Sequence, residues 1–329
     1  MRIVLDAMGT DGAPKSEVAG AALALRELED DFELVLVGDR AVVEEELARH
    51  ADFPRERLLI EHAPDRVLPG EAAASVVRKH PECSIVRGLR QLKEGCADAF
   101  VSAGSTGAVM AGSLLILRPL EGVDRPAIGT MLPTAREPVL MLDAGANVDC
   151  KPHHLVQFAH LGRIYAEDLM GRTNPRVGLL NIGEEPEKGD EVAVEAHQRL
   201  AREPGINFVG NVEGRGIILG SCDVLVCDGF VGNVLLKFYE SVAQFFVGML
   251  KRGGASAGGE LNLGELSRML DYSEYGGAPL LGVNGVTIIC HGGSSPKAIK
   301  NAIRVAAQSV RSSMVEHVAR DLRAAKEPV

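Results

Sequence analysis

Tryptophan is absent from the 329-residue sequence, and aromatic residues make up only 4% of it. The six cysteines form no C-x-x-C pair, which argues against a zinc ribbon and against a thioredoxin-like redox motif. Most of them lie beside apolar runs, so we expect small buried side chains in a reducing cytosol rather than disulfides or metal ligands. The hydrophobic fraction of 46% is sufficient for the core of a large α/β protein.

An excess of positive charge is also missing, because 35 lysines and arginines stand against 45 acidic residues, a net charge of −10. A general nucleic-acid-binding protein is therefore not expected. The N-terminus opens on a strand-like run and has no signal-peptide pattern, which predicts a cytoplasmic protein. The uncharged stretch 99–117 approaches the length of a membrane span, but its Ser- and Gly-rich interior predicts a loop that opens a buried helix.

Several catalytic and cofactor-binding motifs are absent. The sequence has no G-x-G-x-x-G, no G-x-x-x-x-G-K-[ST], no G-x-S-x-G and no H-E-x-x-H. The stretch 214–220 comes close to a dinucleotide-binding pattern, but its final spacing is wrong. His153, His154 and His160 are predicted to be surface or core histidines rather than metal ligands. We therefore expect no cofactor, no metal and no covalent intermediate.

Strand-length apolar runs alternate with helix-length segments along the whole chain. This alternation predicts a three-layer α/β/α fold with a mostly parallel sheet. We expect one domain over 1–329, with an inserted helical hairpin at about 229–272 whose tip is rich in Gly, Ala and Ser. The expected strands are 2–6, 33–37, 57–61, 98–102, 126–131, 138–143, 176–181, 206–209, 223–227 and 285–290, and the expected helices are 14–29, 40–50, 82–94, 105–117, 153–170, 187–202, 229–251, 261–271 and 295–325.

Six of the predicted strands run into polar loops that contain glycine. Sheets of this kind bind ligands beyond the carboxyl ends of their strands, so these loops are expected to gather at one shared cleft. The loops are 6–12, 102–107, 143–147, 181–189, 228–233 and 290–295.

The loop 102–107 comes directly before a helix of small and apolar residues. Its backbone N–H groups and hydroxyls would lie at the positive end of that helix, which makes it a candidate anion site. The alternative is a turn that only caps the helix. The candidate residues are Ser102, Gly104, Ser105, Thr106 and Gly107.

Three other loops offer polar groups with a structural alternative in each case. Asp143, Asn147 and Lys151 form either a site or an Asx-turn beside a solvated lysine. Glu184 and Lys188 belong either to a site or to the first turn of the helix predicted at 187–202. His291 is either a hydrogen-bond donor of the site or a packed loop histidine.

The predicted helix 229–251 carries one strongly apolar face. Its apolar residues recur at alternating steps of four and three, the spacing of a single helix face. Packing in the core or in a dimer explains this face, and a groove for an aliphatic chain is the alternative. The residues are Val231, Leu235, Phe238, Val242, Phe245 and Met249.

Taken together, the ordered motifs of the chain resemble those of the bacterial phosphate acyltransferases. This family makes acyl-phosphates from acyl-carrier-protein thioesters and inorganic phosphate. Thr10 departs from the resemblance, because the family usually carries glycine there, and Gly216 stands where an acidic residue is common. The matching motifs are 6–9, 102–108, 125–128, 143–147, 180–185, 210–215, 228–233, 275–278 and 297–302.

The resemblance implies a fold similar to isocitrate dehydrogenase and phosphotransacetylase, a homodimer, and a role at the start of phospholipid synthesis. Family members associate peripherally with the inner face of the membrane, where the hairpin is thought to touch lipid. The polar hairpin tip of this sequence predicts only weak membrane contact. The acyl carrier is acidic, so a local basic surface is expected on Arg78 and Lys79 or on Lys297, Lys300, Arg304 and Arg311.

Within this resemblance each candidate residue receives a role. Phosphate is assigned to the loop 102–107, helped by Lys151 or Lys188. Asn147, Asn181 and His291 are candidates for polarising the thioester carbonyl or protonating the leaving thiol. Leu235, Phe238 and Val242 are assigned to an acyl groove, and the supporting residues are Asp6, Asp11, Asp143, Glu184, Asp228 and Asn233.

Three other functions stay open on the sequence. An NAD-dependent hydroxyacid dehydrogenase of the same fold is one, although the missing dinucleotide loop disfavours it. A coenzyme A-dependent phosphotransacetylase is the second. A non-catalytic scaffold that recruits lipid enzymes to the membrane is the third.

Overall fold

The computed structural model describes residues 1–29, 31–67, 71, 75–252 and 274–324. The chain divides into two compact units: unit 1 comprises 1–126, 168–171 and 275–329, and unit 2 comprises 127–167 and 172–274. The prediction of one domain over 1–329 stays a prediction. The expected hairpin tip and the expected helix 261–271 lie outside the described residues.

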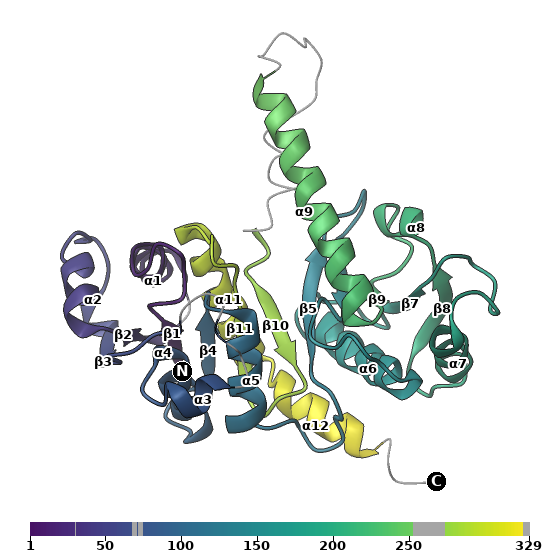
Figure 1. Ribbon diagram of the computed structural model, residues 1–329, viewed down its shortest axis with the longest axis horizontal. Helices are drawn as coiled ribbons and strands as arrows, with labels where there is room; N and C mark the ends of the chain where they lie inside the picture. Colours follow the sequence, from purple (N-terminus) through teal and green to yellow (C-terminus); the bar gives the residue numbers. More distant parts are fainter. Residues whose placement is uncertain (30, 68–70, 72–74, 253–273, 325–329) are drawn as a thin grey trace. The chain divides into compact units, whose positions relative to one another are not determined.

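The sheet of unit 1 has the strand order β3-β2-β1-β4-β11-β10 (Figure 1). Parallel pairing joins β3 through β11, and in β1 Ile3 lies between Leu34 of β2 and Ala99 of β4. Only β10 runs antiparallel to its neighbour β11. The strands are β1 (Arg2–Asp6), β2 (Glu33–Gly38), β3 (Leu58–His62), β4 (Ala99–Ser102), β10 (Ala278–Leu281) and β11 (Val286–Ile289).

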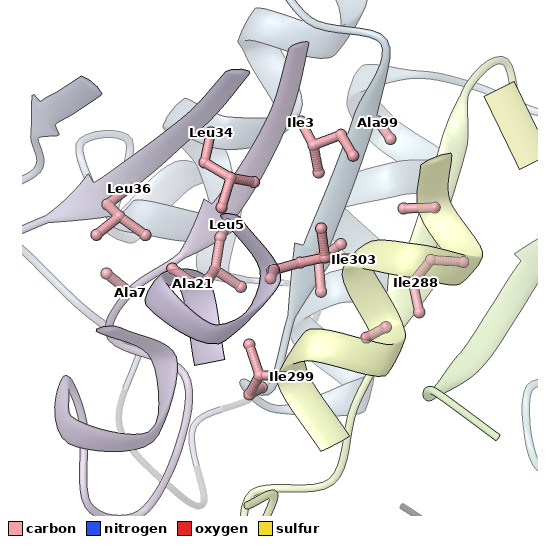
Figure 2. Close-up of a cluster of buried hydrophobic side chains, with 14 of the residues drawn as sticks. Ile3, Leu5, Ala7, Ala21, Leu34, Leu36, Ala99, Ile288, Ile299 and Ile303 are labelled. Carbon is pink, nitrogen blue, oxygen red and sulfur yellow. The ribbon is translucent and has the colours of Figure 1, made fainter. Parts of the chain in front are cut away.

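Helices cover both faces of this sheet. Figure 2 shows Ile3 and Leu5 on one face together with Ile299 and Ile303 of α11, and Ala21 of α1 lies in the same cluster. Each such buried Ile or Leu contributes about 1.5–3 kcal/mol to folding. The helices of unit 1 are α1 (Lys15–Glu27), α2 (Arg40–Leu47), α3 (Val76–Lys79), α4 (Ser84–Lys93), α5 (Thr106–Ile116), α11 (Pro296–Arg311) and α12 (Met314–Ala324), with a 3₁₀ turn η1 (Arg55–Arg57).

The opposite face of the unit 1 sheet packs against α4. Gly88 of α4 lies directly on Phe100 of β4, close enough that an added Cβ would come within 2.4 Å of the phenyl ring. Val4, between Ile3 and Leu5 on β1, contacts the same glycine. Consecutive residues of β1 are therefore buried on both faces, as expected for a covered parallel strand.

Unit 2 has a five-stranded sheet with the order β5-β6-β9-β7-β8. β5 pairs antiparallel with β6, and the other pairs are parallel. Gly162 of α6 packs against Val224 and Leu142 of this sheet. The elements are β5 (Ala127–Leu132), β6 (Val139–Leu142), α6 (Pro152–Asp168), β7 (Arg176–Leu180), α7 (Glu191–Leu200), β8 (Asn207–Val212), α8 (Gly214–Ile218), β9 (Val224–Val226) and α9 (Gly229–Arg252).

The predicted α/β fold with a mostly parallel sheet is confirmed, and several elements differ in detail, among them the short helices α3 and α8, which were not predicted. The helix predicted at 295–325 is interrupted, because Ser313 adopts a left-handed backbone with φ of 53° between α11 and α12. The helix predicted at 187–202 begins at Glu191, because the Asp190 side chain caps it by accepting a hydrogen bond from the N–H of Ala193. The four-residue β10 was not predicted at all.

The described helices include none with the length and apolar character needed to cross a membrane. All six cysteines are free, and four of them are buried, while Cys150 is half-buried and Cys96 is exposed. The predicted role of most cysteines as small buried residues is therefore confirmed.

The contact between Gly88 and Phe100 generates a stability prediction. Gly88→Ala is expected to lower the free energy of unfolding by about 1–3 kcal/mol, because the methyl group overpacks the interface between α4 and β4. Gly12→Ala is the control, because an added Cβ there meets nothing within 4 Å, and it should change stability by less than about 0.5 kcal/mol. Urea unfolding measures both, and equal stability of the two variants would contradict the packing argument.

Candidate active site

Three strand-end loops of unit 1 contact one another. Gly9, after β1, lies so close to the loop after β4 that an added Cβ would come within 2.6 Å of the Gly104 nitrogen. The N–H of Asp11 donates to the carbonyl of Gly292, after β11, at 3.0 Å. The β1 loop therefore lies between the loop that carries Ser105 and the loop that carries His291.

Asp6 and Ser102 form a buried pair at the base of these loops. The Ser102 hydroxyl donates to Asp6 at 2.7 Å and accepts from the N–H of Gly104 at 3.0 Å. Burial raises the pKa of Asp6, and hydrogen bonds from Ser102, Ser84 and the N–H of Met8 oppose that shift. Ser102 is fully buried, so its hydroxyl holds the loop together rather than facing a ligand.

Ser105 and Thr106 differ from Ser102 because their side chains are exposed at the first turn of α5. Ser105 occupies the N-cap position, yet its hydroxyl makes no capping hydrogen bond. The first N–H groups of a helix have no acceptor within the helix and carry partial positive charge. This turn therefore offers several hydrogen-bond donors to an anion. The Ser105 hydroxyl does not cap the helix.

Glu17 was not among the predicted site residues, although it is fully buried beneath the β1 loop. One carboxyl oxygen accepts from the N–H of Thr10 at 2.6 Å, and the other accepts from the Thr10 hydroxyl at 2.9 Å. Burial raises the pKa of Glu17 to about 7. The available signal was a charged residue beside Val18 on the apolar face of a predicted helix, seven residues after Thr10.

Arg66 and Ser84 were also missed. The Ser84 hydroxyl is buried and hydrogen-bonds Asp6, and the positive charge of Arg66 lowers the pKa of the same carboxyl. Within the described residues, the half-buried Arg66 side chain makes no hydrogen bond and no ion pair. Neither residue belongs to a strand-end motif, which is why the sequence pattern did not indicate them.

His291 is exposed near the start of the loop that follows β11. Its Nδ1 accepts a hydrogen bond from the N–H of Gly293 at 3.1 Å. In a neutral imidazole the other nitrogen, Nε2, then carries the proton. The ring is therefore held in the tautomer that presents an N–H donor.

In unit 2 the loop after β6 is organised around the buried carboxylate of Asp143. It accepts hydrogen bonds from the N–H groups of Ile128, Gly145, Ala146 and Asn147 at 2.6–3.2 Å, and from the Asn147 carboxamide at 2.9 Å. Burial raises the pKa of Asp143 and these donors oppose the shift. Five donors suit an ionised carboxylate, so Asp143 supports the loop and is not exposed to a substrate.

Asn147 and Lys151 have different surroundings although they are four residues apart. Asn147 is buried, its amide bonds Asp143, and its carbonyl accepts from the N–H of Gly229 at 2.7 Å. Lys151 is exposed, and its ammonium group forms no ion pair within the described residues. Lys151 is thus an available cation, whereas Asn147 is bound into the loop.

Asn181 closes the loop after β7. Its amide N–H donates to the carbonyl of Lys188 at 2.9 Å, and its amide oxygen accepts from the N–H of Ile182 at 2.8 Å. Lys188 is exposed, with no ion pair to its ammonium group in the described part of the chain. Glu184 lies in this loop rather than in a helical turn, and it faces Arg215 at 3.7 Å.

The loop after β9 begins α9 and adjoins the loop after β6. Asp228 accepts from the N–H groups of Phe230 and Val231 at 2.8 and 2.9 Å, which caps α9. Asn233 lies against Gly145, whose added Cβ would come within 3.4 Å of the Asn233 side chain. The loops after β7 and β9 also line one cavity, so three strand ends of unit 2 are adjacent, as three are in unit 1. The single cleft predicted from all six stays a prediction.

A cavity of about 530 Å³ lies in unit 2 beside these loops. Its polar lining residues include Asn181, Asp190 and Asp228, and most of its wall is apolar. Leu235 and Phe238 line it as predicted positions of an acyl groove, whereas Val242 is not among the lining residues. The apolar wall residues are Leu155, Leu179, Leu180, Ile182, Val192, Ala193, Val231, Val234, Leu235 and Phe238.

Known proteins share both the sequence and the fold of this chain. A family profile described as "Fatty acid synthesis protein" matches residues 1–317. A phosphate acyltransferase from Desulforamulus reducens is 50% identical over 98% of this chain and 97% of its own, and one from Heliobacterium modesticaldum is 50% identical over the full length of both. A phosphotransacetylase from Streptococcus pyogenes has a similar fold, with a TM-score of 0.65 and 18% identity over 94% of each chain. The chain belongs to the phosphate acyltransferase family.

Proposed function

We propose that this protein transfers a fatty acyl group from an acyl-carrier-protein thioester to inorganic phosphate, releasing acyl-phosphate and the free carrier. The observation that carries the proposal is the first turn of α5, where Ser105 and Thr106 present hydroxyls and unpaired helix N–H groups to solvent. Membership of the family supports the reaction class, and the exposed first turn of α5 supports the assignment of phosphate to the loop 102–107.

The reaction needs little covalent help from the protein. A phosphate oxygen attacks the thioester carbonyl, a C–O bond forms, the C–S bond breaks, and the thiolate leaves and takes up a proton. Phosphate is charged before it reacts, and a thiol with a pKa of about 8.5 is a tolerable leaving group. Holding the two reactants in line lowers the free-energy barrier of the reaction by about 7–11 kcal/mol.

The surroundings of each candidate side chain separate donors from supports. Ser105 and Thr106 are exposed and are assigned to phosphate, with Gly104 and Gly107 supplying the close backbone approach. Lys151 or Lys188 is the assigned cation, and His291 the assigned donor to the thioester oxygen or the leaving sulfur. Side chains that hydrogen-bond within the loops or cap a helix are assigned to support, and these are Asp6, Ser102, Asp143, Asn147, Asn181 and Asp228.

The acyl chain is assigned to the 530 Å³ cavity of unit 2. Its size falls in the range of small-molecule sites, and its mostly apolar wall with a few polar groups is suited to an aliphatic tail joined to a polar thioester. Leu235 and Phe238 take part in this wall. Val242, one turn further along α9, is left out of the assignment.

Among the rival functions, acyl transfer to phosphate with coenzyme A as the carrier is the closest. The cavity favours a long chain over acetyl, because its wall presents ten apolar residues. Hydride transfer is disfavoured by the family, and residues 214–218 of the near-match to a dinucleotide pattern form the short helix α8 rather than a glycine-rich loop.

Further partners follow from the resemblance to this family. We expect a homodimer, a cytoplasmic location and weak peripheral contact with the inner face of the membrane through the hairpin. Several apolar side chains on α9 are exposed, as expected of a helix face that a dimer partner or the membrane covers. They include Phe230, Val234, Phe238, Phe245 and Met249. For the acidic carrier, the basic candidates on α11 are partly engaged, since Lys300 pairs with Glu27 at 2.9 Å.

The first test incubates the purified protein with phosphate and a long-chain acyl-carrier thioester, and it measures free thiol together with acyl-phosphate. Thr106→Val should raise the KM for phosphate about 10-fold or more, because a hydrogen bond to a charged group is worth about 1.5–3 kcal/mol. Thr173→Val, exposed before β7, is the matched control and should leave KM unchanged. Thiol release that does not depend on phosphate would refute the reaction.

Removing the available cation tests the second assignment. Lys151→Ala should leave the melting temperature unchanged, because its ammonium group has no protein partner among the described residues, while kcat falls roughly 100-fold through loss of charge stabilisation. Lys93→Ala, exposed in the last turn of α4, provides the control. A wild-type rate in Lys151→Ala would remove this lysine from the mechanism and leave Lys188 as the candidate.

The cavity assignment predicts a change in chain-length preference. Val192→Phe narrows the cavity and should lower kcat/KM for long acyl chains about 10-fold relative to short ones, the lower end of discrimination by one apolar contact. Val194→Phe is the matched control on α7, because Val194 is half-buried but does not line the cavity. Equal losses for all chain lengths in both variants would place the acyl chain elsewhere.

A further inference from the structure

A buried pair of residues, Glu17 and Thr10, fixes the β1 loop to α1, and no function has been assigned to this pair above. Glu17 on α1 binds both the N–H and the hydroxyl of Thr10, and both residues are buried.

Short contacts connect the chain around Thr10 to the loop 102–107, the candidate anion site. Its neighbour Gly9 lies against the backbone of Ala103 and Gly104, where an added Cβ would come within 2.6–2.9 Å. On the other side, Asp11 donates to the carbonyl of Gly292. A shift of Thr10 is thus transmitted to the loop that leads into Ser105, because there is no free space between them.

None of the described titratable groups that face Glu17 carries a positive charge that would stabilise its ionised carboxylate. Asp6 faces it from β1, and the Cys290 thiol faces it from the end of β11. The helix α11 presents the apolar Ile299 at Gly20, and its Lys300 is paired with Glu27, about three turns along α1. The helix α2 packs with Val43 and Leu47, which are apolar. No described cation is paired with Glu17.

We propose that Glu17 is a positioning residue for phosphate, which acts through Thr10 and takes up a proton when the dianion binds at the first turn of α5. This inference rests on the phosphate placement proposed above. Protonation turns one carboxyl oxygen into a donor to the Thr10 hydroxyl, keeps the other as acceptor for the Thr10 N–H, and removes a negative charge from the neighbourhood of phosphate. The proton comes from the solvent and returns when phosphate leaves.

Burial gives Glu17 a pKa of about 7 against an ordinary value of 4.5. The folded chain therefore holds the proton more tightly than the unfolded chain. The associated stability is fully present below pH 4.5 and is lost as the pH rises to about 7. The same proton is available for exchange near neutral pH.

Glu17→Gln mimics the protonated form, because its amide accepts the Thr10 N–H and donates to the Thr10 hydroxyl. The KM for phosphate is measured from pH 6 to pH 8 in the wild type and in this variant, so that the ionisation of phosphate itself cancels. The ratio of wild-type KM to variant KM should rise about fivefold or more across this range, the lower end of coupling between linked sites. Thr10→Ser should keep the wild-type profile, and Thr10→Val should alter it.

Two further readouts separate this proposal from the phosphate placement. Urea unfolding should show that the loss of stability between pH 4.5 and pH 7 is smaller in Glu17→Gln. Calorimetric titration with inorganic phosphate at pH 7.5, in buffers of different ionisation enthalpy, should show more proton uptake in the wild type than in Glu17→Gln. Parallel KM profiles and equal proton uptake would overturn the role of Glu17, whereas an unchanged KM in Thr106→Val would overturn the phosphate placement itself.

Discussion

Each unit of this protein places a buried carboxylate at the end of a central strand, and the loops around it are organised by the hydrogen bonds that this carboxylate must receive. Asp6 at the end of β1 binds Ser102 and the N–H of Met8, and Asp143 after β6 binds four backbone N–H groups and the Asn147 amide. A buried carboxylate without such donors would be very unfavourable. The strand-end loops are therefore fixed before any substrate arrives.

Because the carboxylates engage their own neighbours, the polar residues of the strand ends fall into two groups. One group forms its side-chain hydrogen bonds within the loops and comprises Ser102, Asn147 and Asn181. Thr106 and Lys151 lie just beyond these groups, exposed and without side-chain partners among the described residues. Within each unit, loops whose polar groups are already hydrogen-bonded hold an exposed donor in place, which is the arrangement that preorganisation requires.

The fold and the identity of the strand-end loops were accessible from the sequence, because apolar strands and glycine-bearing turns leave a strong pattern. The roles inside the loops were less accessible. Whether Ser102 or Thr106 faces solvent depends on which hydroxyl reaches Asp6, and residues 96 positions apart decide that contact. Glu17 was missed for a similar reason, because its hydrogen bonds to Thr10 form only when α1 packs beneath the β1 loop. The break between α11 and α12 at Ser313 is a single backbone conformation that helical periodicity does not reveal.

The cavity of unit 2 is built entirely from α6, α7, α9 and neighbouring strand ends, whereas the hydroxyls assigned to phosphate belong to α5 of unit 1. The residues proposed for the two reactants are thus encoded in separate stretches of the gene. Selection on the proposed acyl cavity can then act on one stretch without changing the residues proposed to bind phosphate.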